Sequence, residues 1–197
     1  MNTREIAAWM LANCIVIDTE TTGIGTDAAV VEFAAVDGET GAVLVDSLVH
    51  TSATIEPGAA AVNNITPGML MFKPKIAELL TQVMKAHGGR RELCAYNASF
   101  DDRLLQQSIK RDLQEMAVPV SYNSPTVWVQ HDAMELANRH FAKDHASWDA
   151  DRSCFRRMSL RRCCEIAGVD FKGAAHRALS DAIATRDLLK VIAEGRV

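Results

Sequence analysis

The sequence of 197 residues lacks long hydrophobic runs, a signal segment and a regularly spaced set of cysteines. Acidic residues interrupt its apolar stretches before they reach the roughly 20 residues of a membrane-spanning helix, so we expect no membrane association. The N-terminus has no basic segment followed by an apolar core, which argues against secretion. The five cysteines are odd in number and form no Cys-x-x-Cys motif. They favour a reducing cytoplasm and argue against both a disulfide framework and a zinc site.

Basic residues are also in deficit, because 21 Lys and Arg face 25 Asp and Glu and leave a net charge of -4. A chain of this charge does not bind nucleic acid through its overall field. Nucleic acid is therefore an unfavourable partner unless something neutralises the surplus carboxylates. The sequence has no repeat, no low-complexity tract and no linker-like stretch, and its length suits one hydrophobic core. We predict a single domain over residues 1–197.

Hydrophobic patterning predicts an α/β fold. Apolar runs rich in β-branched residues predict three strands that can form an antiparallel meander, over residues 14–18, 30–36 and 43–49. Two later strands are predicted over residues 93–96 and 126–129. Helical spacing of apolar residues predicts helices after Pro74 and over residues 101–109, 134–140, 160–167 and 177–193. This order indicates a five-stranded mixed sheet flanked by helices. Trp9, Trp128 and the eight methionines are expected in the core.

Acidic residues stand at three points where a strand ends or a helix begins. Asp18 and Glu20 are two residues apart, so they project from the same face of an extended chain. Two carboxylates on one face repel unless a cation or a proton lies between them. Asp101 and Asp181 each stand near the start of a predicted helix, and His176 precedes Asp181 by five residues. Each has an ordinary alternative, namely a strand end facing water, a helix cap or a surface histidine.

The three segments together carry more information than each one alone. Asp-Thr-Glu-Thr-Thr-Gly at residues 18–23, Tyr-Asn-Ala-Ser-Phe-Asp at 96–101 and His-Arg-Ala-Leu-Ser-Asp at 176–181 follow in this order. This arrangement resembles the DnaQ-like, or DEDDh, family of 3′–5′ exonucleases, and the similarity extends over about residues 13–193. The resemblance implies a ribonuclease H-like fold in which three antiparallel strands are followed by parallel ones.

The resemblance also implies how the site residues divide the work. Asp18, Glu20, Asp101 and Asp181 would hold two divalent cations, either Mg²⁺ or Mn²⁺, with Asp18 bridging both. His176 would act as the general base. Hard oxygen ligands suit these cations, and two of them suit an in-line phosphodiester hydrolysis. Their combined charge of +4 equals the acidic excess, which removes the objection that the net charge raised.

Other positions bear on the substrate. The resemblance suggests that the terminal nucleotide contacts Thr21, Thr22, Asn97 and Phe100, although a structural role for Asn97 and Phe100 is an equal alternative. Asn63 stands where family members commonly carry a histidine, which leaves the substrate preference open. Five arginines fall between Arg152 and Arg162, near Trp148 and Phe155. They either follow a single strand by phosphate contact and stacking or form a solvated helix face.

We therefore expect a metal-dependent 3′–5′ exonuclease that releases nucleoside monophosphates from DNA, with RNA also open. The alternatives are an exoribonuclease that trims RNA ends or short oligoribonucleotides, a proofreading subunit of a polymerase, and a catalytically silent binding module. The last is disfavoured because all five site positions are filled. The expected partners are the 3′ ends of single-stranded DNA or RNA, and the sequence leaves open a homodimer and a polymerase or repair partner.

Overall fold

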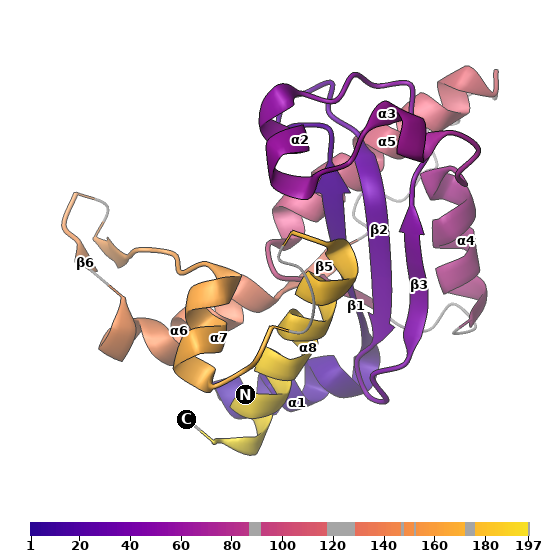
Figure 1. Ribbon diagram of the computed structural model, residues 1–197. Helices are drawn as coiled ribbons and strands as arrows, with labels where there is room; N and C mark the ends of the chain where they lie inside the picture. Colours follow the sequence, from indigo (N-terminus) through magenta and orange to yellow (C-terminus); the bar gives the residue numbers. More distant parts are fainter. Residues whose placement is uncertain (87–91, 118–128, 147, 152, 172–175, 197) are drawn as a thin grey trace.

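The computed structural model describes residues 1–86, 92–117, 129–146, 148–151, 153–171 and 176–196 (Figure 1). Its elements are α1 (Thr3–Asn13), β1 (Cys14–Thr21), β2 (Val30–Asp37), β3 (Val43–Leu48), α2 (Pro57–Asn63), α3 (Pro67–Leu70), α4 (Ile76–Ala86), β4 (Glu92–Ala95), α5 (Ala98–Glu115), β5 (Val129–Asp132), α6 (Ala133–His145), β6 (Trp148–Asp149), β7 (Cys154–Phe155), α7 (Leu160–Ala167) and α8 (Ala178–Glu194).

The main sheet has five strands in the order β3-β2-β1-β4-β5. The pairs β1–β2 and β2–β3 are antiparallel, whereas β4 pairs in parallel with both β1 and β5. This confirms the predicted mixed sheet with three antiparallel strands and parallel additions. The last strand begins at Val129, and residues 126–128 of the predicted strand lie outside the described part of the chain.

Helices cover both faces of the sheet, which explains why its central strands are largely buried. Every residue of β2 is buried. In β1, Val16 packs into a cluster with residues of α1, α6, α7 and α8, whereas Ile15 and Ile17 pack into a cluster with α4 and α5. Successive side chains of a strand point to opposite faces, so one strand contributes to both cores. Burying each such side chain stabilises the fold by about 1.5–3 kcal/mol.

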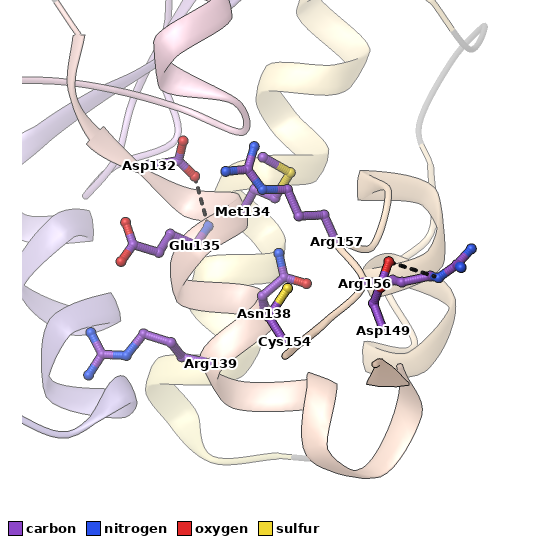
Figure 2. A pocket seen from close by; sticks show the side chains of 9 residues that line it. All are labelled: Asp132, Met134, Glu135, Asn138, Arg139, Asp149, Cys154, Arg156 and Arg157. Carbon is purple, nitrogen blue, oxygen red and sulfur yellow. Dashed lines mark hydrogen bonds and ion pairs between the residues drawn. The ribbon is translucent and has the colours of Figure 1, made fainter. Parts of the chain in front are cut away.

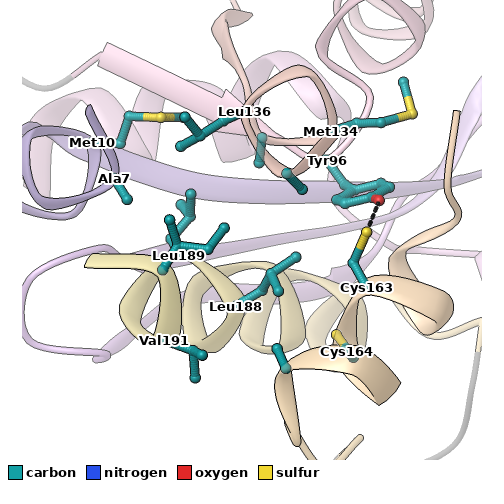
Figure 3. Packing of buried hydrophobic residues seen from close by; sticks show 14 of the residues in the cluster. Ala7, Met10, Tyr96, Met134, Leu136, Cys163, Cys164, Leu188, Leu189 and Val191 are labelled. Atoms are coloured by element: carbon teal, nitrogen blue, oxygen red, sulfur yellow. Dashed lines mark hydrogen bonds between the residues drawn. The ribbon is translucent and has the colours of Figure 1, made fainter. Parts of the chain in front are cut away.

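The first of these clusters also holds the end of β4 against α7 (Figure 3). The hydroxyl of Tyr96 donates to the carbonyl oxygen of Met158 at 2.8 Å and contacts the sulfur of Cys163 at 3.2 Å. Burial raises the pKa of the Tyr96 hydroxyl far above its usual range. Tyr96 opens the second acidic segment, so this bond anchors the chain just before it reaches Asp101.

Several expectations about the core and the helices were wrong. Trp9 is 38 % exposed and contacts the ring of His131 edge to face. Five of the eight methionines are exposed on the surface: Met1, Met69, Met71, Met84 and Met116. Trp128 lies outside the described residues. The helices α1, α2 and α3 and the β6–β7 hairpin were not predicted. The elements α2, α3, β6 and β7 have too few residues to establish a period, whereas α1 concentrates its apolar residues only weakly on one face. Within the described residues, no helix is long and apolar enough to cross a membrane.

Candidate active site

The sheet brings the predicted acids to one edge. Asp18 and Glu20 lie near the carboxyl end of β1, and the parallel strand β4 leads at the same edge into α5, whose first turn carries Asp101. Asp181 lies in the first turn of α8, which packs against β1 and β2. His176 lies just before that helix. We call these five residues the acidic site.

Asp18 lies at the electrostatic centre of the acidic site. Burial raises its pKa well above the usual range, and the nearby charges of Asp101, Asp181 and Glu20 raise the pKa further. All three partners therefore lie close enough to repel its carboxylate. A carboxylate in this position keeps its charge only when a cation compensates for its neighbours.

Glu20, His176 and Asp181 form a compact group. One ligand atom from each lies within 4.8 Å of the other two, with His176 exposed and the two acids half-buried. Burial and the charge of Asp181 raise the pKa of Glu20 to about 7. Burial also raises the pKa of Asp181, although the charge of His176 opposes that rise. This group can hold a small cation near a histidine that solvent reaches.

Asp101 occupies the deepest place in the acidic site and is only 4 % exposed. The hydroxyl of Thr19 donates a hydrogen bond of 2.8 Å to its Oδ1. Burial nevertheless raises the pKa of Asp101 to about 7, because one hydroxyl replaces only part of the lost hydration. Asp101 is therefore held in a fixed orientation beside Asp18.

The donor set fits divalent cations of the Mg²⁺ or Mn²⁺ type. Four carboxylates offer hard oxygen ligands, and their raised pKa values indicate that the protein compensates their charges only in part. Among the described residues, only the ligand atoms of Glu20, His176 and Asp181 all lie within 4.8 Å of one another. Asp18 and Asp101 are not part of that group, but the charges of Asp101, Glu20 and Asp181 act on the carboxylate of Asp18.

The predicted nucleotide contacts are engaged within the protein. Thr21 donates its hydroxyl to the carbonyl oxygen of Gly23 at 2.8 Å, and the hydroxyl of Thr22 accepts from the Ala29 amide at 3.0 Å. Both side chains are buried and shape the loop after β1. Thr21 and Gly23 line a pocket of about 300 Å³ next to Glu20.

The other two predicted contacts lie at the start of α5. Asn97 occupies the N-cap position, where its carbonyl oxygen accepts from the Phe100 amide at 2.9 Å and its side-chain oxygen accepts from the Ser99 hydroxyl at 3.4 Å. Phe100 is half-buried, and the Arg103 guanidinium lies 5.4 Å from the centre of its ring. The structure thus gives both residues a local structural role and leaves the ring of Phe100 partly accessible.

Asn63 lines the same pocket as Glu20 and is buried. Its amide nitrogen donates to the Thr21 carbonyl oxygen at 3.1 Å, and its side-chain oxygen accepts from the Ile65 amide at 3.0 Å. Both polar atoms of the side chain have partners inside the protein. Asn63 therefore fixes the wall of the pocket. The sequence alone does not reveal this role.

Two residues that sequence reasoning missed, Glu32 and Arg177, lie directly against the acidic site. Glu32 stands opposite Glu20 in the register of β1 and β2 and is 1 % exposed. Its carboxylate accepts hydrogen bonds from the Arg177 guanidinium and from the Ala178 amide. The available signal was an acid inside the apolar run at residues 30–36, since such an acid is rarely buried without a partner.

The predicted basic segment divides into parts with different surroundings. Arg156 and Arg157 line a pocket of about 800 Å³ between the start of α6 and the β6–β7 hairpin, together with Asp132, Asn138 and Arg139 (Figure 2). Arg156 lies 3.7 Å from Asp149 across the hairpin. We call residues 148–157, of which residue 152 is outside the described part, the basic hairpin.

Two further arginines of that segment, Arg161 and Arg162, lie on α7, and Arg152 is outside the described part of the chain. Arg161 lies over the ring of Phe171 at 5.4 Å, and Arg162 pairs with Glu165 at 3.2 Å. Each is thus committed to a neighbour of its own. The charge of Arg161 also opposes the rise in the pKa of Asp181, whereas Arg156 and Arg157 are exposed at an open pocket.

Comparison with known proteins is consistent with this geometry. A sequence model of the exonuclease family RNase_T matches residues 15–189. The chain is 28 % identical to the uncharacterized exonuclease CP81 of Escherichia phage 186, over 95 % of this chain and 91 % of that protein. The structure of exonuclease X in complex with 5′-overhanging duplex DNA has the same fold, with a TM-score of 0.63 and 24 % identity over 93 % of each chain. The nuclease domain of 3′hExo, a DEDDh family member bound to rAMP, gives a TM-score of 0.63 at 14 % identity, also over 93 % of each chain.

Proposed function

The chain belongs to this exonuclease family, in its DnaQ-like (DEDDh) branch with a ribonuclease H-like fold, and from this premise we propose a metal-dependent 3′–5′ exonuclease. The proposed reaction hydrolyses the terminal phosphodiester bond at a 3′ end of DNA and releases a nucleoside monophosphate. The observation that carries the proposal is the convergence of four acids with raised pKa values and His176 on one edge of the sheet.

We assign Asp18, Glu20, Asp101 and Asp181 as ligands of two divalent cations, Mg²⁺ or Mn²⁺. Such cations, when bound, activate a water nucleophile and stabilise the charge of the leaving 3′ oxygen. The position of Asp18 amid the other three acids supports a bridging role. Asp101, fixed by Thr19, and the half-buried Glu20 and Asp181 would complete the two sets of ligands.

We assign His176 as the general base. Its imidazole is exposed and lies within 4.8 Å of the ligand atoms of Glu20 and Asp181. An unprotonated ring nitrogen at this place can accept the proton of the attacking water, and the exposed ring can pass that proton to solvent.

The terminal nucleotide is assigned to the pocket beside Glu20. Its volume of about 300 Å³ lies at the lower end of the range for small-molecule sites, and its walls combine polar residues with Ile24 and Val62. The buried Asn63 and Thr21 would fix the shape of the wall against which the sugar and base rest. Exonuclease X bound to duplex DNA and 3′hExo bound to rAMP make both DNA and RNA reasonable substrates to test.

The proposal is tested with 5′-labelled single-stranded DNA, duplex DNA and RNA of one sequence, each with Mg²⁺ or Mn²⁺. A ladder of 3′-shortened products that disappears in Asp18→Ala supports it. Asp144→Ala is the matched control, because this exposed aspartate lies on α6. Internal cuts, or full activity in Asp18→Ala, would overturn the proposal. Degradation of RNA alone would assign the enzyme to the exoribonucleases.

A further inference from the structure

Glu32 carries a carboxylate in one of the least accessible places of the molecule. It lies within β2 and is 1 % exposed, as are the apolar side chains around it. Its two oxygens accept from Arg177 Nε at 2.9 and 3.1 Å, from Arg177 Nη2, and from the Ala178 amide at 3.1 Å. These donors compensate the buried charge, so Glu32 is fully occupied within the protein and is not a free ligand for a cation.

Glu32 lies directly across from Glu20 in the antiparallel pair β1–β2. Side chains of directly paired residues lie on the same face of a sheet, where two like charges repel. The Arg177 guanidinium offsets part of this repulsion, since its charge opposes the rise in the pKa of Glu20 that burial, Asp181 and Glu32 cause. Arg177 thus links the strand pair that carries Glu20 to the segment that carries His176.

Arg177 is also the residue through which α8 begins. It occupies the N-cap position and makes no side-chain cap, while its carbonyl oxygen accepts from the Asp181 amide at 3.1 Å. Glu32 takes the place of the missing cap, because its Oε2 accepts from the Ala178 amide in the first turn. One buried acid on β2 therefore fixes the start of the helix that presents Asp181.

His176 immediately precedes this anchored residue and has a φ of 61°, in the left-handed region. Such a conformation is unfavourable for a residue with a side chain and persists where its surroundings hold it. The exposed imidazole has no hydrogen-bond partner among the contacts of the described residues, so the bonds of Arg177 supply the nearby anchor.

We propose that Glu32 and Arg177 form a positioning clamp that holds His176 and the first turn of α8 against the β1–β2 pair, so that the imidazole meets Glu20 and Asp181. Neither residue of the clamp touches the reacting atoms. Its effect passes through His176, and the inference rests on the proposed role of His176 as the base. Lysine at position 177 would keep the charge but lose the two-pronged geometry that sets the orientation.

The first test compares Arg177→Lys with Arg186→Lys. Arg186 lies on the same helix and ties it to the β2–β3 turn through the carbonyl oxygens of Gly38 and Glu39. We expect Arg177→Lys to lower kcat by about 10- to 100-fold with little change in KM, because a shift of about 1 Å in a catalytic group has such an effect. Arg186→Lys should leave kcat unchanged. Equal kcat values in both variants would overturn the clamp.

The second test asks whether the clamp acts through His176. In a His176→Ala background, Arg177→Lys should cause no further loss in single-turnover rate, because the group that it positions is absent. Additive losses would show that Arg177 acts independently of His176 and would overturn the inference. If His176→Ala alone retains full activity, the proposed general base fails instead, so the two failures are distinguishable.

A spectroscopic measurement makes the test independent of turnover. The imidazole signals of His176 can be assigned by their loss in His176→Ala. We expect these signals to shift or broaden in Arg177→Lys and in Glu32→Gln but not in Arg186→Lys, with the thermal midpoint recorded for each variant. Unchanged His176 signals in folded Arg177→Lys and Glu32→Gln proteins would overturn the clamp, and Arg177→Lys keeps the test valid if Glu32→Gln does not fold.

Discussion

In the acidic site, each carboxylate is carried by a strand of the main sheet or by a helix that packs on it. In the basic hairpin, by contrast, Arg156 and Arg157 directly follow β7, and both strands of this hairpin have only two residues. Asp101 is 4 % exposed and bonded to Thr19, while the side chain of Arg156 is 70 % exposed. Figure 1 shows the hairpin carried by α6 and α7 and projecting away from the sheet.

This contrast has an energetic meaning. The fold imposes close like charges on the acidic site, so the site carries an electrostatic cost that ligands can relieve. The hairpin carries mixed charges that water already screens, and Arg156 has Asp149 as a partner. Substitutions in the acidic site should therefore change activity strongly and stability in unusual directions, whereas hairpin substitutions should change binding alone.

Asp101→Asn is expected to give the largest effect, and to move activity and stability in opposite directions. We expect kcat to fall by about a thousandfold or more, because a charged group that organises the reaction centre is lost. The metal-free protein should melt at a higher temperature near neutral pH, since the substitution removes a charge that raises the pKa of Asp18. The asparagine oxygen can still accept from Thr19.

The measurements are steady-state kcat with Mn²⁺ and thermal melting in a chelator. Asp144→Asn, on the exposed side of α6, is the control and should change neither. A lower melting temperature for Asp101→Asn would contradict the electrostatic account, because it would mean that the charged carboxylate stabilises the metal-free fold.

The pH dependence of stability gives the next largest effect. Folding raises the pKa values of Glu20 and Asp101 to about 7. Because the protonated forms are favoured in the folded state, their contribution is fully present below about pH 4 and is lost as the pH rises through about 7. The metal-free protein should thus melt lower at pH 8 than at pH 5, by about 5 °C for a chain of this size.

Saturating Mn²⁺ should remove most of this fall, because a cation replaces the protons as the compensating charge. The variant Glu20→Gln/Asp101→Asn should show a flatter dependence without metal. The measurement is differential scanning calorimetry between these two pH values. A melting temperature that stays constant or rises toward pH 8 in the metal-free wild-type protein would refute the claim that like charges in the acidic site destabilise the fold.

Asn63→Ala tests the wall of the pocket beside Glu20 and should have an intermediate effect. It removes the hydrogen bonds to the Thr21 carbonyl and from the Ile65 amide. Leaving such groups unpaired costs about 1–3 kcal/mol, so we expect the melting temperature to fall by several degrees. KM should rise while kcat changes less, since we assign the wall to contact with the substrate rather than with the reacting atoms.

Asn13→Ala is the control for that variant, because Asn13 is an exposed asparagine that donates one hydrogen bond, to the Trp9 carbonyl oxygen. It should leave KM unchanged. A fall in kcat with constant KM for Asn63→Ala would show instead that the pocket wall sets the geometry of the reaction centre.

The sequence predicted the acidic site because its information is local. Asp18 and Glu20 share a face through the two-residue period of a strand, and Asp101 and Asp181 lie in the first turns of helices that begin where the motifs indicate. The apolar runs predicted the sheet for the same reason. The helices α2 and α3 have only seven and four residues, which is too short for a repeating pattern of apolar residues to indicate a helix.

Contacts between residues that are far apart in the chain could not be predicted from the sequence. The bond between Glu32 and Arg177 joins positions 145 residues apart, and neither position has a periodic pattern that names its partner. The hydroxyls of Thr21 and Thr22 suggested substrate contacts, but the fold directs them to Gly23 and Ala29. Charge count left two interpretations of the basic segment open, because the partners of Arg161 and Arg162 are visible only in the structure.

Substitutions in the basic hairpin should have the smallest effect, and they test directly whether the hairpin, unlike the acidic site, contributes to binding alone. The pocket that it lines begins at Asp132, which accepts from the Ala98 amide three residues before Asp101. We therefore expect a nucleic-acid strand that leaves the acidic site to pass Arg156 and Arg157. The double variant Arg156→Ala/Arg157→Ala should raise KM a few-fold, leave kcat unchanged and flatten the dependence of log KM on log salt by about 0.7 for each phosphate that is no longer neutralised. Arg162→Ala, whose side chain pairs with Glu165, is the matched control and should keep the wild-type salt dependence. An unchanged slope in the double variant would mean that the hairpin only carries solvated charges.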